Sequence, residues 1–288
     1  MKKVLVFGAL VVALFISTGL MGKAVEAAVA ACTTEVITED DIVRQAENTP
    51  PTNEWVLYTR NAGNGTFHTG PATPPLGVGS LELITPTDED KVTLFNYEHI
   101  GTPLSGINQI LYSTYRTAGS EQQVASLNLQ VDVNGSAPGG FTTLVFEPVY
   151  NTSQGAVVSG QWQNWDAYSG GQAIWWSSNP IPGAPNRDTF VTWDAILAAN
   201  SDAVIVGGIG INQGSGNPGL TTSVDAFSFG TADACVTYNF DPYEVAADKD
   251  ACKNGGWESL TDAEGNSFKN QGQCVAFVAS KGKSGGKK

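Results

Sequence analysis

Aromatic and amide side chains are interleaved in the segment QWQNWDAYSGGQAIWWSS, residues 161–178. Indole rings stack on the apolar C–H face of a sugar, and neighbouring Asn, Gln and Asp side chains bind its hydroxyl groups. The segment therefore predicts a carbohydrate-binding surface made by Trp162, Trp165, Tyr168, Trp175 and Trp176. The alternative is that these rings form core. In an extended chain Trp162 and Trp165 lie on opposite faces, as do Trp175 and Trp176, so at least one ring of each pair would be buried.

A second polar surface is predicted on two other segments. In SLNLQVDVNG, residues 126–135, apolar residues alternate with outward-facing polar ones, namely Asn128, Gln130 and Asp132. In INQILYSTYR, residues 107–116, Tyr112 and Arg116 share one face. We take Tyr112 and Gln130 as candidate carbohydrate-binding residues of this surface, although such a face on a sandwich is commonly just solvated.

Catalytic chemistry has weaker support. A glycosidase places two carboxylates about 5–10 Å apart across the scissile bond. Glu98 and Glu147 are the best candidates, with His99 close to the first, but no spacing links them. The chain also has no Gly-x-Ser-x-Gly motif, which would position a serine nucleophile. No catalytic residue is therefore assigned.

The elements that must position these residues are almost all strands. Short segments with alternating apolar residues are separated by Gly, Pro, Asn and Asp clusters, which is typical of strands joined by turns. One short helix is predicted around TWDAILAANSD, residues 192–202, with Thr192 capping its start and Asn200 its end. Strands and helices do not alternate, so the sequence predicts an all-β, antiparallel, jelly-roll-like β-sandwich.

The N-terminus has the layout of a secretory signal peptide. Lys2 and Lys3 precede an uncharged apolar run over residues 4–20, and small residues follow. The longest later apolar stretch, residues 203–211, is too short to cross a bilayer, so no transmembrane segment is expected in the mature chain. We predict a secreted protein. A lipid anchor at Cys32, in the segment VAAC, is an alternative that charged residues just before it disfavour.

Four cysteines remain after this segment, and an even set outside the cytosol indicates disulfides. Proximity in sequence favours Cys252 with Cys274, which leaves Cys32 with Cys235. Zinc and redox sites are disfavoured, because histidines are distant and no Cys-x-x-Cys pair occurs. We therefore expect a small disulfide-closed clasp near the C-terminus, with a structural or docking role.

Charge is unevenly distributed along the chain, whose formal net charge is −13. Residues 32–248 hold five basic and 23 acidic residues, whereas residues 249–288 hold seven lysines and four acids. The acidic part should repel nucleic acid, so no nucleic-acid partner is expected. We divide the chain into a signal peptide (1–31), a lead-in (32–52), a sandwich domain (53–242), a Cys-bracketed C-terminal motif (243–280) and a basic, disordered tail (281–288).

Several segments occur in an order that resembles a family of secreted bacterial β-sandwich domains related in appearance to carbohydrate-binding jelly rolls. Examples are GPATPPLGVGSLEL, LNLQVDVNG, TLVFEPVYN and SVDAFSFG, and the resemblance covers residues 53–242. Separately, CKNGGW…FKNQGQCV resembles a short C-terminal motif of unrelated secreted bacterial proteins. Neither resemblance supplies a catalytic residue. The first implies that Asp225, at the position of a common calcium ligand in such modules, binds a structural Ca²⁺.

Together these features predict a secreted, non-catalytic protein that binds extracellular or cell-wall polysaccharide. Two alternatives stay open. One is a polysaccharide lyase or hydrolase on the same fold, and the other is a structural envelope or adhesion protein.

Overall fold

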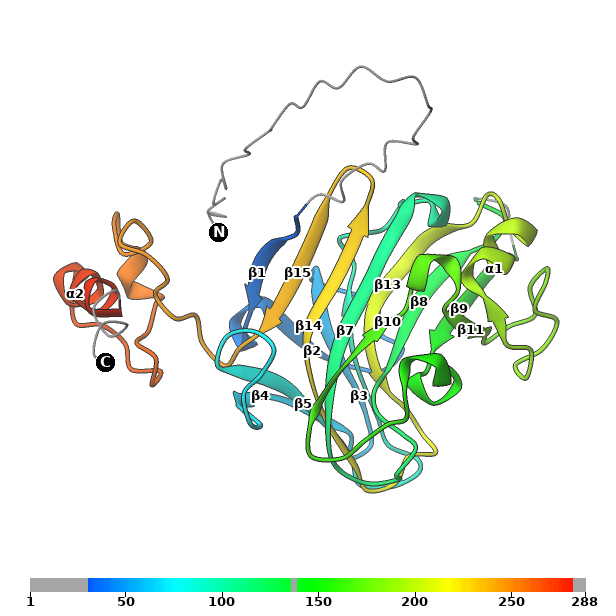
Figure 1. The fold of residues 1–288 in the computed structure, drawn as a ribbon, viewed down its shortest axis with the longest axis horizontal. Coiled ribbons are helices and arrows are strands. Elements are labelled where there is room, and N and C mark those ends of the chain that lie inside the picture. Colours follow the sequence, from blue (N-terminus) through cyan, green and yellow to red (C-terminus); the bar gives the residue numbers. More distant parts are fainter. Residues whose placement is uncertain (1–30, 136–138, 282–288) are drawn as a thin grey trace, which may run out of the picture.

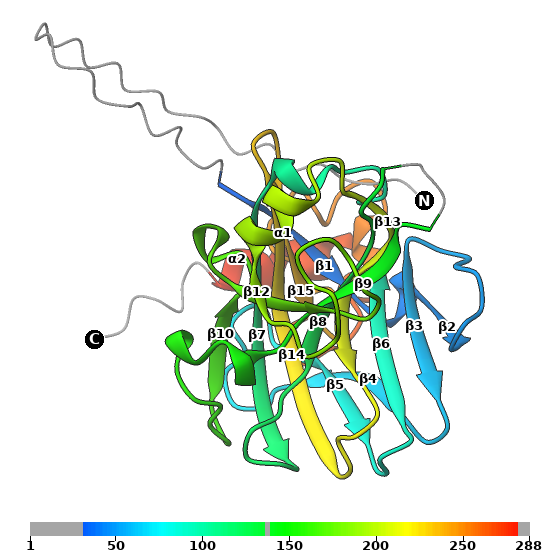
Figure 2. The ribbon, with the colours of Figure 1, turned by 90° about the vertical axis from the view of Figure 1, so that its right-hand side faces the viewer.

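The protein is a β-sandwich with a small C-terminal appendage. The computed structural model describes residues 31–135 and 139–281. Two sheets are packed face to face (Figures 1 and 2), and Figure 2 separates β10, β7 and β14 of the first sheet from β6, β3 and β2 of the second. The predicted signal peptide lies outside the described residues, apart from Ala31.

The first sheet is organised around β14 (Leu220–Thr231), which pairs with three other strands. On one side β14 pairs with β7 (Ile107–Ala118), which in turn pairs with β10 (Trp162–Asp166). On the other side its first half pairs with β5 (Gly79–Thr85) and its second half with β15 (Cys235–Phe240). Strands β4 (Asn64–Thr69) and β1 (Thr33–Ile37) complete the sheet beside β5 and β15.

The second sheet has eight strands in the order β12-β11-β9-β8-β13-β6-β3-β2. Their bounds are β2 (Ile42–Ala46), β3 (Trp55–Arg60), β6 (Lys91–Asn96), β8 (Ser126–Asp132), β9 (Phe141–Phe146), β11 (Ile174–Ser177), β12 (Val191–Thr192) and β13 (Val204–Gln213). All strand pairs are antiparallel except β1 with β15 and β2 with β3. The predicted sandwich is confirmed.

Alternation decides which face of each strand enters the core. Leu127, Leu129 and Val131 of β8 are fully buried between the sheets, so the residues between them face outward. The helix α1 (Trp193–Ala199) begins where predicted, because the Thr192 side chain accepts a hydrogen bond from the backbone N–H of Ala195.

The lead-in is part of the sandwich, which corrects the predicted boundary at residue 53. Strand β1 extends the first sheet and β2 extends the second, so the N-terminal segment ties both sheets together. Cys32 forms a disulfide with Cys235 at the start of β15, as predicted, and this bond fixes β1 beside its partner strand.

The C-terminal segment folds as a separate clasp closed by the predicted Cys252–Cys274 disulfide. Figure 1 shows it beside one edge of the sandwich. It contains a second helix, α2 (Gln271–Lys281), which the sequence did not predict. Its own small core consists of Ala246, Cys252, Leu260, Phe268 and Cys274.

Neither of the two α-helices within residues 31–135 and 139–281 has the length and apolar character needed to cross a lipid bilayer.

Candidate functional site

An open groove of about 650 Å³ crosses the outer face of the eight-stranded sheet. Strand register explains why residues distant in sequence meet there. Asn212 of β13 lies opposite Thr93 of β6 on one side and opposite Ser126 of β8 on the other. In the next row, Asn128 is opposite Val145, which is opposite Trp176 of β11. The groove therefore runs across the strands, with polar residues towards β3 and aromatic residues towards β11.

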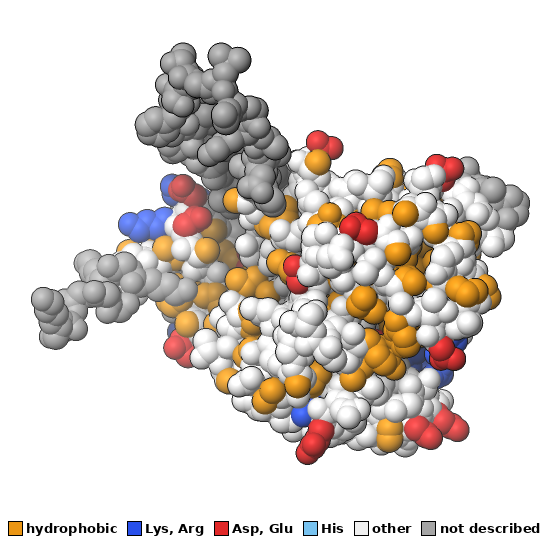
Figure 3. Space-filling view, turned by 45° about the vertical axis from the view of Figure 1, so that its right-hand side comes forward, with side chains coloured by type: hydrophobic (Ala, Val, Ile, Leu, Met, Phe, Trp, Pro, Cys, Tyr) orange, Lys and Arg blue, Asp and Glu red, His pale blue; other side chains and the backbone are white. Residues whose placement is uncertain are grey.

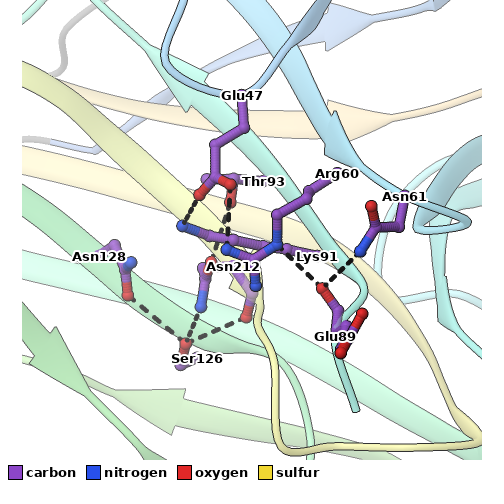
Figure 4. Close-up of polar contacts among 9 residues, drawn as sticks. All are labelled: Glu47, Arg60, Asn61, Glu89, Lys91, Thr93, Ser126, Asn128 and Asn212. Atoms are coloured by element: carbon purple, nitrogen blue, oxygen red, sulfur yellow. Dashed lines mark hydrogen bonds and ion pairs between the residues drawn. The ribbon is translucent and has the colours of Figure 1, made fainter. Parts of the chain in front are cut away.

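The polar end of the groove holds two cations that share one carboxylate (Figure 4). The Glu47 carboxylate accepts from Lys91 Nζ at 2.7 Å and from Arg60 Nη1 at 3.1 Å. Arg60 also donates its Nε–H to the backbone oxygen of Glu89 at 2.9 Å. Burial raises the pKa of Glu47, but the hydrogen bonds and charges of the two cations outweigh it and lower this pKa overall. Glu47 is therefore ionised at neutral pH.

The middle of the groove is an array of amide and hydroxyl groups, also drawn in Figure 4. The Asn212 side chain donates from Nδ2 to Ser126 Oγ at 3.1 Å and accepts from Thr93 Oγ1 at 2.9 Å. Ser126 Oγ donates to the Asn212 backbone oxygen at 3.0 Å. These contacts hold Asn212 and Ser126, which line the groove, in fixed orientations that suit hydrogen bonding to a ligand. Thr93 is 2% exposed and only supports Asn212.

The aromatic end is built around Trp176, which is half-buried. Its Nε1–H donates to Glu147 Oε2 at 2.8 Å, and the Arg187 guanidinium lies 5.0 Å from the ring centroid. Tyr150 and Phe190 form an exposed ring pair with centroids 4.3 Å apart, and 45% and 42% of their surfaces are exposed. Exposed rings of this kind offer apolar faces to a ligand without any rearrangement of the core.

Glu147 is an acid of the groove whose pKa is raised. Burial raises its pKa, and the hydrogen bond from Trp176 together with the charge of Arg187 offsets part of that rise. The Tyr150 hydroxyl also responds to two acids of this end, because burial and then the charges of Glu147 and Asp188 raise its pKa. One carboxyl group of the groove is thus less acidic than an ordinary glutamate.

The tryptophans of residues 161–178, which were predicted to bind sugar, are divided between the two sheets. Trp176 lies in the groove, but Trp165 and Trp175 are buried and belong to the core, so their assignment as sugar-binding residues is wrong. Trp162 lies on the first sheet, where its Nε1–H donates to the Pro71 backbone oxygen at 3.0 Å and its ring contacts Tyr115 edge-on. The alternation argument correctly required one buried ring in each pair.

Other predicted residues also lie outside the groove. Tyr112 is 1% exposed and donates its hydroxyl to the Ala125 backbone oxygen, so it cannot reach a ligand. Gln130 is opposite Thr143, which lines the groove, but Gln130 itself does not line it, and its Oε1 accepts from the Gly208 N–H at 2.8 Å. Tyr168 packs partly buried against the core, with its ring 6.5 Å from that of Trp193. These residues serve the fold.

The acids considered for hydrolysis are separated. Glu147 lines the groove, whereas Glu98 is exposed outside the groove and accepts from the Tyr238 hydroxyl at 3.2 Å. His99 Nε2 lies 3.0 Å from the same hydroxyl, and its ring stacks on Phe229 with centroids 4.0 Å apart. Glu98 and Glu147 therefore do not form an acid pair.

Asp225 anchors a loop. It is buried, and its two carboxylate oxygens accept from the backbone N–H groups of Leu76 at 2.8 Å and Phe240 at 3.1 Å. Burial raises the pKa of Asp225 to about 7, although the backbone hydrogen bonds oppose that rise. Asp241 holds the same loop through the N–H groups of Val78 and Gly79.

A side chain in place of Gly77, in the same loop, would collide with Asp241. Gly77 has a φ of +55°, and a Cβ there would lie 1.9 Å from an Asp241 oxygen, so only glycine fits.

In the part of the chain that the structure describes, no group of three His, Cys, Asp or Glu side chains is placed to hold a metal ion. The proposed calcium at Asp225 stays a prediction.

Sequence reasoning missed most of the groove. Tyr150, Phe190, Arg60 and Lys91 belong to segments far apart in the chain, and only strand register brings them together. One signal was available, since basic residues are so scarce in residues 32–248 that their shared location is informative. Comparison with family models, with curated proteins and with solved structures found no match to this chain.

Proposed function

We propose that this protein is exported and binds polysaccharide in the groove on the eight-stranded sheet. The observation that carries the proposal is the composition of that groove, which has exposed aromatic rings at one end and oriented amide and hydroxyl groups beside them. Sugars need both kinds of contact, because each ring has an apolar face and a rim of hydroxyl groups. The two disulfides are compatible with export.

The length of the groove favours a chain of sugars over a single one. It crosses six neighbouring strands, from β3 to β11. Adjacent strands are about 4.8 Å apart, so five steps span about 24 Å. A saccharide laid across the strands would contact Tyr150 and Phe190 at one end and reach Lys91 at the other.

A second candidate function is cleavage of the bound polysaccharide. It is favoured by Glu147, a carboxyl with a raised pKa that lines the groove together with Asp188. A group that stays protonated to higher pH than an ordinary glutamate could act as a general acid, and hydrolysis needs a second carboxylate across the bond. Binding remains the leading proposal, because the stacking and hydrogen-bonding groups require no second acid in a set position.

The experiment is a pull-down on insoluble glycans, run beside an assay for released sugars. We expect retention without release for the wild type, and weaker retention for Tyr150→Ala, whose exposed ring contributes little to the fold. Trp162→Ala is the matched control, since that ring lies on the other sheet. Release of sugars that disappears in Glu147→Gln would establish the enzyme. Neither retention nor release on any glycan would favour a structural or adhesion role and contradict the proposal.

A further inference from the structure

The basic side chains of this acidic protein are concentrated in the groove. Residues 32–248 contain only five Lys and Arg against 23 acids, and three of the five, Arg60, Lys91 and Arg187, line the groove. Of the other two, Arg44 pairs with Glu39 and Arg116 is buried. Figure 3 shows acidic side chains scattered over one side of the molecule, with few basic ones. A surface without a binding role would not be expected to gather most of the basic residues in one place.

Two of these cations retain donors for a ligand. Lys91 has three N–H donors and Arg60 has five. Glu47 takes one donor from each, and the Glu89 backbone oxygen takes one more from Arg60. The Lys91 and Arg60 side chains are 28% and 37% exposed, whereas that of Glu47 is 18% exposed. The carboxylate is therefore less accessible to a ligand than the cationic groups it holds.

Of the three acids that precede Lys91 in the chain, Asp88 and Glu89 are exposed, whereas Asp90 is buried and does not compete for the groove. Asp90 is 1% exposed, and its oxygens accept from the backbone N–H groups of Ala62 and Thr87. Burial raises the pKa of Asp90, but the hydrogen bonds from Thr87 and Ala62, with a smaller contribution from the charge of Arg60, lower this pKa overall. Asp90 and Glu47 together balance the charges of Arg60 and Lys91, but neither acid presents its oxygens to a ligand as freely as the cations present their N–H groups.

The third cation of the groove, Arg187, interacts with the aromatic end rather than with Glu47. Arg187 lies over the Trp176 ring and reduces the pKa rise of Glu147, and Asp188 follows it in the chain. An anion at this end would meet two acids at close range. An anion at the Lys91 end would meet oriented N–H donors, with Asn212 and Ser126 beside them (Figure 4).

We propose that the polysaccharide bound by this groove is acidic, and that one of its anionic groups, a carboxylate or a sulfate, binds Lys91 and Arg60 while an uncharged sugar face packs on Tyr150 and Phe190. This inference rests on the proposed function and assigns its ligand class. Charge-assisted hydrogen bonds to Lys and Arg are the strongest polar contacts that the groove offers. They also give the bound chain a direction across the strands.

The test compares matched polymers that differ only in charge. Affinity is measured for polygalacturonate and its methyl ester, and for dextran sulfate and dextran, at low and at high salt. We expect at least one charged polymer to bind about tenfold more tightly than its uncharged counterpart, which corresponds to about 1.4 kcal/mol. The advantage should shrink at high salt because part of it is electrostatic. A preference for polygalacturonate alone would identify a carboxylate as the anionic group that binds. A preference for both charged polymers would show that the site accepts a carboxylate or a sulfate.

Variants locate the anion. Lys91→Gln should remove most of the charge preference, and Lys91→Arg, which keeps the charge, should preserve it. Arg44→Gln is the matched control, because it removes an exposed cation that pairs with Glu39 away from the groove. Equal affinity for charged and uncharged polymers, or an equal loss in the Arg44 variant, would overturn the inference and leave polysaccharide binding standing. Failure of every polymer to bind would instead overturn the proposed function.

Discussion

Removing the Cys252–Cys274 disulfide should unfold the clasp and leave the sandwich folded. The clasp has a core of only five buried residues, separate from that of the sandwich. Units of fewer than about 40 residues seldom fold without such a cross-link. The two cysteines are 22 positions apart, and closing a loop of that length lowers the entropy of the unfolded chain by an amount worth about 3 kcal/mol.

The double variant Cys252→Ala/Cys274→Ala tests this value. A loss of about 3 kcal/mol multiplies the unfolded population of the clasp about a hundredfold. Lys253 and Lys269 are exposed within the clasp and are trypsin sites. When cleavage passes through local unfolding, its rate follows that population. We expect much faster cleavage at both lysines, measured by mass spectrometry, with an unchanged melting temperature of the sandwich.

The control is Cys32→Ala/Cys235→Ala, which removes the other disulfide. That bond joins β1 to β15 and lies in the sandwich, so this variant should destabilise the sandwich without accelerating cleavage at Lys253. Unchanged cleavage in the Cys252→Ala/Cys274→Ala variant would refute the reasoning, because the small core would then suffice to hold the clasp together.

Further outcomes follow from the buried titratable groups. Burial lowers the pKa of His99 to about 4, so its NMR titration should have a midpoint far below the ordinary 6.5. Since the unfolded chain then binds more protons between pH 4 and 6.5, the His99 contribution to stability is present above pH 6.5 and is lost as the pH falls towards 4; thermal melts of His99→Gln should show a weaker fall across this window. Asp225 acts in the opposite sense, because its pKa of about 7 exceeds its unfolded value of 3.8, and stability from this group should decrease as the pH rises from 3.8 to 7. If Asp225 binds a structural Ca²⁺, excess chelator should lower the melting temperature, because a ligand bound only to the folded state stabilises it. An unchanged melting temperature, with no metal found by elemental analysis, would contradict the calcium site.

Local sequence signals predicted the fold well where they depend on neighbouring residues. Alternation at Leu127, Leu129 and Val131 identified a strand and its buried face, and Thr192 marked the start of α1. Cysteine spacing predicted both disulfides. Helix α2 was missed although Cys274, Phe277 and Val278 have the i, i+3, i+4 spacing of a helix, and these residues pack in the clasp core.

The site was less predictable, because it is a product of strand register. A cluster of tryptophans within one segment identified the right residue type, but the strand period sent Trp165 and Trp175 into the core and left Trp176 facing the groove. Tyr150 and Phe190 lie in two different connecting segments, and no local sequence pattern indicates that these segments lie close together. A ligand surface built from both sheet rows and loops becomes visible only in three dimensions.

The measurement that tests the central claim most directly is hydrogen–deuterium exchange with and without a bound acidic oligosaccharide. We predict slower exchange in the loops that border the groove, at residues 147–154, 185–190 and 214–217, and no change in β10 or in the clasp. Protection confined to β10 and the loop anchored by Asp225, or to the clasp, would contradict the account and place the ligand elsewhere on the molecule.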